Sequence, residues 1–114
     1  MEQIGGYLES LFSLKGKVIL LTGAAGGIGE AFARGLAAAG GSVSLCDLNI
    51  RHCDEVVSEL NGKNMDTKAY ELDVADIESI KKCVAAVLND FGRIDVLINC
   101  AGINKREGFL DVEE

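Results

Sequence analysis

The sequence predicts an α/β fold in which helices cover both faces of one parallel sheet, a doubly wound arrangement. Three observations predict it. Short apolar runs alternate with amphipathic helical segments along the chain. A glycine-rich stretch follows the first apolar run, and an acidic residue closes the second. Because crossovers between parallel strands are right-handed, we expect the succession β-α-β-α-β-α-β with strand order 3-2-1-4, as part of a larger sheet.

The first βαβ unit is predicted over residues 17–46. Its first strand, residues 17–22, is a continuous apolar run that fits a strand buried on both faces. The helix after it ends at two glycines and carries Glu30 and Arg34 at the spacing of an ion pair. Residues 42–46 form the second strand. The predicted buried stripe of the helix consists of Ile28, Ala31, Phe32, Gly35, Leu36 and Ala39.

Two further helices and two further strands complete the pattern. Residues 67–72 and 95–100 are the predicted strands. The second helix stops at an Asn-Gly pair, and its apolar stripe is Cys53, Val56, Val57 and Leu60. The third helix ends at Gly92, and its apolar stripe is Ile77, Ile80, Val84, Val87, Leu88 and Phe91. We expect one domain spanning residues 1–114, with residues 1–13 as a loosely attached arm.

Charge and composition exclude several classes of partner. The 114 residues are 48% hydrophobic, with 18 acidic against 11 basic residues and a formal net charge of -7. No basic run is present, so we expect neither nucleic acid nor a membrane surface as a partner. The opening MEQIGGYLES lacks the basic and apolar regions of a signal peptide, which predicts a cytoplasmic protein.

The cysteines and the single histidine predict no metal site. No C-x-x-C spacing occurs among Cys46, Cys53, Cys83 and Cys100, so we expect reduced thiols that pack as small hydrophobic groups. His52 is expected to be solvated on the polar side of the second helix.

The glycine-rich stretch TGAAGGIG predicts a site for a dinucleotide pyrophosphate. Unpaired N–H groups and the positive end of the helix dipole attract phosphate at a helix N-terminus, provided that no Cβ obstructs it. Gly23 is placed for the turn off the first strand, Gly27 for approach of the pyrophosphate, and Gly29 for close packing of the helix. The spacing departs from the common G-x-G-x-x-G fingerprint, and the lysine of an ATP-binding P-loop is missing.

Asp47 predicts the choice of cofactor. It closes the second strand 18 residues after Gly29, near the offset at which an acid binds the adenine ribose in dinucleotide-binding folds. A carboxylate there favours NAD over NADP, and the adjacent Leu48 supplies no cation for a 2'-phosphate. The alternative is that Asp47 only caps the helix after it.

Taken together, the motifs TGxxxGIG, Asp47, Asp73-Val74 and Asn99-Cys100-Ala101-Gly102 resemble the N-terminal part of classical short-chain dehydrogenases/reductases. Residues 11–17 and 101–106 are similar to the gluconate 5-dehydrogenase branch. Two positions depart from the family pattern. Cys100 replaces an asparagine, and Ala75 replaces a helix-capping serine or threonine, a role that Asp76 can take over.

The resemblance implies a role for each motif residue. Gly23, Gly27, Ile28 and Gly29 would line the pyrophosphate, while Asp73 and Val74 would flank the adenine. Asp47 would select NAD. The segment Asn99, Ala101 and Gly102 would support the sheet and pass near the ribose on the nicotinamide side.

The family's catalytic residues are not in this chain. They are a Y-x-x-x-K pair, a serine and an asparagine, and in the family all of them follow the position of residue 114. Tyr7 and Tyr70 are the only tyrosines, and neither has a lysine four places on. The resemblance implies an NAD-dependent oxidoreductase acting on a small alcohol or carbonyl substrate, and we expect the 114 residues alone to be inactive.

Two other functions stay open from the sequence. One is a non-catalytic dinucleotide-binding or sensor module, and the other is an adenosylmethionine-dependent methyltransferase, against which Thr22 and the Asn99 segment argue. The fourth strand would leave a bare sheet edge and face, which predicts either a piece of a longer protein or copies that cover each other in a homo-oligomer.

Overall fold

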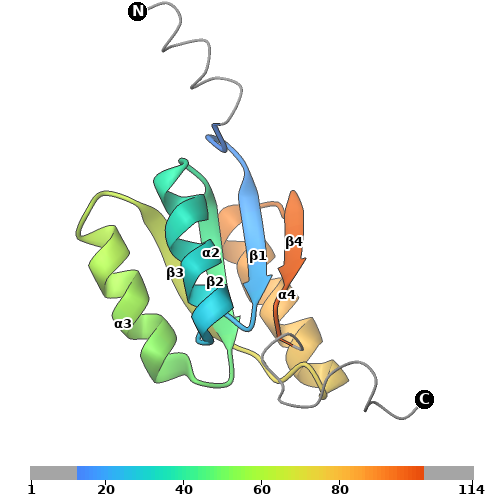
Figure 1. Cartoon of the computed structure of the whole chain (residues 1–114). Coiled ribbons are helices and arrows are strands. Elements are labelled where there is room, and N and C mark those ends of the chain that lie inside the picture. The colour runs from blue at the N-terminus through green and yellow to red at the C-terminus, as the bar shows by residue number, and fades with distance from the viewer. Residues whose placement is uncertain (1–12, 102–114) are drawn as a thin grey trace, which may run out of the picture.

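The computed structural model describes residues 13–101, and the predicted succession of strands and helices is confirmed there (Figure 1). Residues 1–12 of the predicted arm, and Gly102 with the tail after it, lie outside the described residues. The elements in chain order are β1 (Val18–Thr22), α2 (Gly27–Ala38), β2 (Ser42–Asp47), α3 (Ile50–Asn61), β3 (Asp66–Glu71), α4 (Ile77–Phe91) and β4 (Val96–Asn99).

The four strands form one parallel sheet in the order β3-β2-β1-β4, as the sequence predicts. Helices α2 and α3 lie on one face of the sheet and α4 lies on the other, which gives a doubly wound, Rossmann-like three-layer fold (Figure 1). In the register, Thr22 of β1 lies beside Cys46 of β2 on one side and Asn99 of β4 on the other. The carboxyl ends of these three strands therefore meet at one edge of the sheet.

Successive residues of β1 point into two separate cores. Ile19 and Leu21 belong to the core under α2 and α3, whereas Val18 and Leu20 belong to the core under α4. All five residues of β1 are buried, because the strand is central and covered on both faces. Each large aliphatic side chain buried in this way stabilises the fold by about 1.5–3 kcal/mol.

The predicted buried face of α2 is wrong. The helix buries its small residues Gly29, Ala33 and Ala37, while Ile28 and Phe32 stay 44% and 43% exposed. Small side chains let the helix axis approach the sheet closely, and this places the larger apolar residues on the outer flank. Of the predicted stripe, Leu36 packs against the core.

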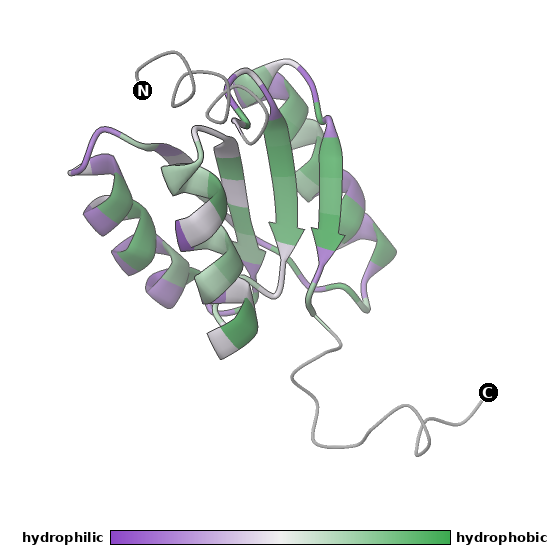
Figure 2. Ribbon diagram, turned by 45° about the horizontal axis from the view of Figure 1, so that its top comes forward, coloured by the Kyte–Doolittle hydropathy of each residue, from purple (hydrophilic) through white to green (hydrophobic). Residues whose placement is uncertain are grey.

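Helix α3 packs as predicted, and α4 does so only in part. The buried residues of α3 are Cys53, Val56 and Leu60. On α4, Cys83 and Val87 are buried, but Ile77 is 67% exposed. Figure 2 shows that both β1 and β4 consist mainly of hydrophobic residues. Unlike β1, β4 has a neighbouring strand on one side only, and its Leu97 is 65% exposed. The bare edge expected at the fourth strand is therefore present within the described residues.

All four cysteines are buried and free, as expected. Within residues 13–101, no helix combines the length and the apolar character that crossing a membrane requires.

Candidate cofactor site

The glycine loop joins β1 to α2 at the edge where the strands end (Figure 1). Gly23 turns the chain off β1 with a φ of +70°, a left-handed conformation that glycine adopts readily. A Cβ at Gly23 would also lie 2.7 Å from the backbone nitrogen of Ala101, which follows β4. This position therefore requires glycine for both conformation and space.

The other two glycines differ in what surrounds them. A Cβ on Gly29 would collide with the carbonyl oxygen of Gly23, so the absence of a side chain lets the first turn of α2 close against the loop. At Gly27 a Cβ would meet nothing within 4 Å. The fold itself thus leaves open space at Gly27, which fits a ligand that approaches the backbone there.

The N-terminus of α2 lacks a side-chain cap. Its N-cap residue is Gly26, whereas Asn49 and Asp76 cap α3 and α4 by accepting hydrogen bonds from backbone N–H groups. Capping by Asp76 confirms that it replaces the residue missing at Ala75. The first N–H groups of α2 carry the positive end of the helix dipole and remain available to an anion.

Asp47 connects the end of β2 to the glycine loop. Its Oδ2 accepts a hydrogen bond from the N–H of Ala25 at 3.1 Å, and its Oδ1 accepts one from the N–H of Asn49 at 2.9 Å. The alternative that Asp47 only caps α3 is wrong, because Asn49 is the N-cap and accepts from the N–H of His52. Asp47 is thus placed beside the loop, as its spacing predicts.

A cavity of about 530 Å³ lies between the glycine loop and the ends of β2 and β3. Leu48 and Val74 border it with 62% and 49% of their surfaces exposed. The predicted site residues that line this cavity are Gly23, Asp47, Leu48, Asp73, Val74 and Ala101.

Four predicted residues do not line the cavity. Gly27 and Ile28 border a shallow groove on the outer flank of α2 instead, and Gly29 is buried under the loop. Asn99 faces another cavity, below β1 and β4.

Asn99 holds the end of β4 to the end of β1. Its Oδ1 accepts hydrogen bonds from the Thr22 hydroxyl at 2.5 Å and from the N–H of Ala101 at 3.2 Å. The N–H of Cys100 donates to the carbonyl of Thr22 at 3.1 Å. These contacts fix the chain that passes against Gly23.

Asp73 shapes the loop after β3. Its Oδ1 accepts from the N–H of Ala75 at 3.0 Å, and its own N–H donates to the Ser79 hydroxyl at 2.9 Å. The turn leaves Val74 largely exposed at the cavity rim.

His52 is not simply solvated, so that expectation is wrong. Its Nε2 lies 2.7 Å from Glu30 Oε1, which joins the first turn of α3 to the first turn of α2. The hydrogen bond to Glu30 raises the pKa of His52, and hydrogen bonds from His52 and Arg34 lower the pKa of Glu30. The predicted pair of Glu30 with Arg34 is confirmed at 2.8 Å.

Six residues that line the cavity were not predicted as site residues: Ala25, Gly26, Cys46, Asn49, Leu72 and Ala75. Ala25 and Ala75 contribute backbone N–H groups, and no side-chain signal distinguishes them. Asn49 could have been found, since asparagine is a favoured N-cap and precedes the predicted helix.

Tyr70 does not belong to this site. It lies on β3, where its hydroxyl donates to Asp90 Oδ2 at 2.6 Å. Burial and this hydrogen bond raise the pKa of Tyr70 well above its usual value of 10, so its phenol is a poor proton donor.

Comparisons with known proteins agree with this geometry. The model of the short chain dehydrogenase family matches residues 17–114. D-threitol dehydrogenase of Mycolicibacterium smegmatis is 41% identical over 92 residues, which cover 81% of this chain and 35% of that protein. NADP-dependent mannitol dehydrogenase of Aureobasidium melanogenum is 41% identical over 113 residues, 96% of this chain and 42% of that protein.

Two further comparisons concern the gluconate 5-dehydrogenase branch and the fold. 5-keto-D-gluconate 5-reductase of Escherichia coli is 36% identical over 107 residues, 94% of this chain and 42% of that protein. A dehydrogenase/reductase from Sinorhizobium meliloti 1021 superimposes with a TM-score of 0.83 at 30% identity, covering 95% of this chain and 43% of that one. The chain spans less than half the length of these relatives.

Proposed function

Because the chain belongs to the short-chain dehydrogenase family, as its motifs predict, we propose that it is the cofactor-binding part of an NAD(P)-dependent oxidoreductase. The parent reaction interconverts a small alcohol and a carbonyl compound. The observation that carries the proposal is the uncapped N-terminus of α2 beside open space at Gly27 and the cavity bordered by Asp47. A diphosphate needs such N–H groups, and a ribose needs such an acid.

Each part of the dinucleotide has a proposed partner. The pyrophosphate lies on the backbone of Gly23, Gly27, Ile28 and Gly29. Asp73 and Val74 flank the adenine, and Asn99, Ala101 and Gly102 pass near the ribose on the nicotinamide side. When bound, the cofactor accepts or supplies the hydride, and this chain's residues hold and orient it.

NAD is the proposed cofactor, and NADP is less favoured. The carboxylate of Asp47 can accept hydrogen bonds from a ribose with a free 2'-hydroxyl and repels a 2'-phosphate. Leu48 and Asn49 next to it carry no positive charge. One relative is named as NADP-dependent, so family membership alone does not decide between NAD and NADP. The proposed preference of this chain for NAD therefore depends on Asp47.

Turnover requires groups that these 114 residues do not supply. The sequence contains no tyrosine with a lysine four places on, and Tyr70 is engaged with Asp90. We therefore propose that residues 1–114 form the N-terminal part of one domain, inactive alone. Leu97 and Ile77 are exposed apolar side chains. We propose that a further segment of the protein, or a second copy in a homo-oligomer, packs against them. We propose a cytoplasmic location, which the net negative charge fits.

The second candidate is a non-catalytic dinucleotide-binding module, which would use the same glycine loop and cavity. Calorimetric titration with NAD and NADP, followed by an assay of alcohol oxidation, separates the candidates. Both predict binding of NAD by the 114-residue chain. Activity restored by a longer chain that carries Y-x-x-x-K supports the oxidoreductase, whereas a chain that binds neither dinucleotide contradicts both.

A further inference from the structure

Two thiols from distant parts of the sequence lie side by side in the core under α4. Cys46 on β2 and Cys83 on α4 are 37 positions apart, and their Sγ atoms are 3.5 Å from each other. Both belong to the hydrophobic cluster that also contains Leu20, Tyr70 and Val87. The thiol of Cys46 also lies within hydrogen-bonding distance of the carbonyl of Ser44, at 3.6 Å.

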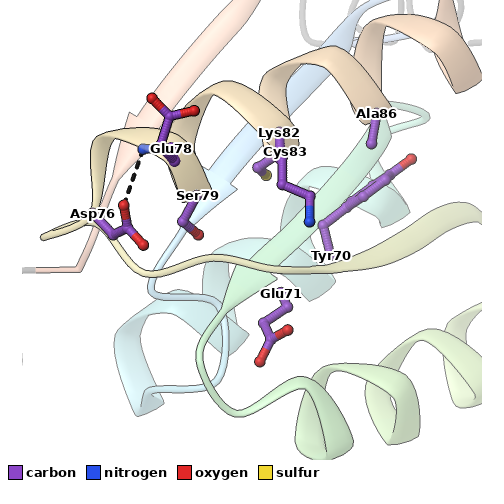
Figure 3. A pocket seen from close by; sticks show the side chains of 8 residues that line it. All are labelled: Tyr70, Glu71, Asp76, Glu78, Ser79, Lys82, Cys83 and Ala86. Carbon is purple, nitrogen blue, oxygen red and sulfur yellow. Dashed lines mark hydrogen bonds between the residues drawn. The ribbon is translucent and has the colours of Figure 1, made fainter.

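The two thiols differ in access. Cys46 is fully buried and borders the cavity beside the glycine loop, while Cys83 is 4% exposed and lines two other cavities, of about 490 and 340 Å³. Figure 3 shows the larger one, where Cys83 lies on α4 among side chains that include Lys82 and Tyr70. A small oxidant in either cavity therefore reaches Cys83 first, with Cys46 directly behind it.

The other two cysteines cannot compete for this partner. Cys53 and Cys100 belong to the cluster on the opposite face of the sheet, under α2 and α3. The sheet separates the two pairs of thiols, so the arrangement specifies one pairing.

We propose that Cys46 and Cys83 form an oxidation site, which closes to a disulfide between β2 and α4 when a hydroperoxide enters the cavity. In the first step Cys83 loses its thiol proton and the thiolate attacks the peroxide, whose O–O bond breaks. This gives a sulfenic acid, and the leaving hydroxide or alkoxide takes up a proton to become water or an alcohol. In the second step the sulfur of Cys46 attacks the Cys83 sulfur. The S–O bond breaks, the thiol proton of Cys46 leaves with the oxygen, and water is released.

The electrons balance across both steps. The two thiols lose two electrons and two protons, and the hydroperoxide is reduced to water, or to an alcohol and water. A dithiol reductant reverses the change by thiol–disulfide exchange.

Charge and geometry support this order of events. The hydrogen bond with Cys46 lowers the pKa of Cys83, while that contact and burial raise the pKa of Cys46. Cys83, which also lines the two cavities, is thus the thiol placed to attack the peroxide. A disulfide needs the sulfurs about 1.5 Å closer than they lie here. Rotation of the two side chains, with a small shift of α4, is the movement that closure requires.

The test counts thiols in the folded 114-residue chain after treatment with hydrogen peroxide. After quenching, the chain is denatured, alkylated with N-ethylmaleimide and weighed by mass spectrometry before and after proteolysis. We expect two of the four cysteines to escape alkylation, and a cross-linked peptide pair containing Cys46 and Cys83. A dithiol should restore all four reactive thiols. Four alkylated cysteines after oxidation, or a bond that involves Cys53 or Cys100, would overturn the proposal.

Matched variants separate this pair from general thiol oxidation. Cys53→Ala removes a buried thiol from the opposite face, and it should leave the protected pair intact. Cys46→Ser keeps the shape of its site and removes the second thiol, so dimedone should then trap a sulfenic acid on Cys83. Dimedone labelling found instead on Cys53 or Cys100 would contradict the assignment. None of these readouts depends on cofactor binding, so the result is distinct from failure of the proposed function.

Discussion

The carboxylate of Asp47 accepts a hydrogen bond from the backbone N–H of Ala25 at 3.1 Å, so the acid that closes β2 is tied directly to the glycine loop. The same carboxylate accepts from the N–H of Asn49, at the start of α3. One side chain thereby positions both the loop proposed to hold the pyrophosphate and the turn proposed to hold the ribose.

Replacing Asp47 with alanine should weaken NAD binding and narrow the gap between NAD and NADP. The variant loses a charged acceptor for the ribose and for the loop, and hydrogen bonds to charged groups contribute about 1.5–3 kcal/mol each. This corresponds to roughly 10- to 100-fold in affinity for NAD. Asp54→Ala, which removes an exposed acid of α3, is the matched control and should change little. Unchanged selectivity in Asp47→Ala, measured by calorimetry, would show that the acid does not choose the cofactor.

Gly27→Val should fold normally and fail to bind NAD. The space at Gly27 is open in the chain itself, so the valine collides only with the pyrophosphate. Gly35→Val is the control, because Gly35 lies on the same helix and is equally open. Circular dichroism checks the fold and calorimetry checks binding. Equal NAD affinity in the two variants would show that the glycine loop does not bind the pyrophosphate.

Gly29→Ala should destabilise the chain by about 3 kcal/mol, the upper end of the usual cost of overpacking. Its Cβ would collide with the carbonyl of Gly23, so the loop must move. Gly35→Ala should instead stabilise the chain by about 0.5–1 kcal/mol, since it gains helix propensity at an open position. Urea denaturation measures both. A Gly29→Ala variant as stable as the parent would mean that the loop does not close on α2 as described.

The contact of His52 with Glu30 should stabilise the fold most between about pH 4.5 and 6.5, the ordinary pKa values of the two groups. Because the folded pKa of His52 is raised, its contribution is complete below 6.5 and is lost as the pH rises through the raised value. Because the folded pKa of Glu30 is lowered, its contribution is complete above 4.5 and is lost as the pH falls through the lowered value.

Urea midpoints of the parent and of His52→Ala, measured from pH 4 to pH 9, check this dependence. The difference between the two proteins should be largest in that window and should shrink above it. A difference that stays constant across the range would indicate that the contact is not electrostatic.

The sequence was sufficient wherever a local pattern determines the structure. The strand ends, the loop glycines and the cap at Asp76 follow from residue type and spacing, because each depends on backbone geometry within a few residues. Asp47 could be placed beside the loop because parallel strands bring their carboxyl ends together.

Tertiary features needed the structure. Helix α2 has two apolar faces, and periodicity favoured the larger side chains of Ile28 and Phe32 over the face of Ala33, although close approach to the sheet selects small residues. The contact of Cys46 with Cys83 and that of His52 with Glu30 each join separate elements, so no local spacing predicts them.

The most direct test of the central claim is an NMR titration of the labelled chain with NAD. The account predicts that the amide signals of residues 23–29 and of Asp47 shift on binding, while those near Asn61, at the far end of α3, stay unchanged. Saturable NAD binding that leaves the signals of residues 23–29 in place, or no binding at all, would contradict it.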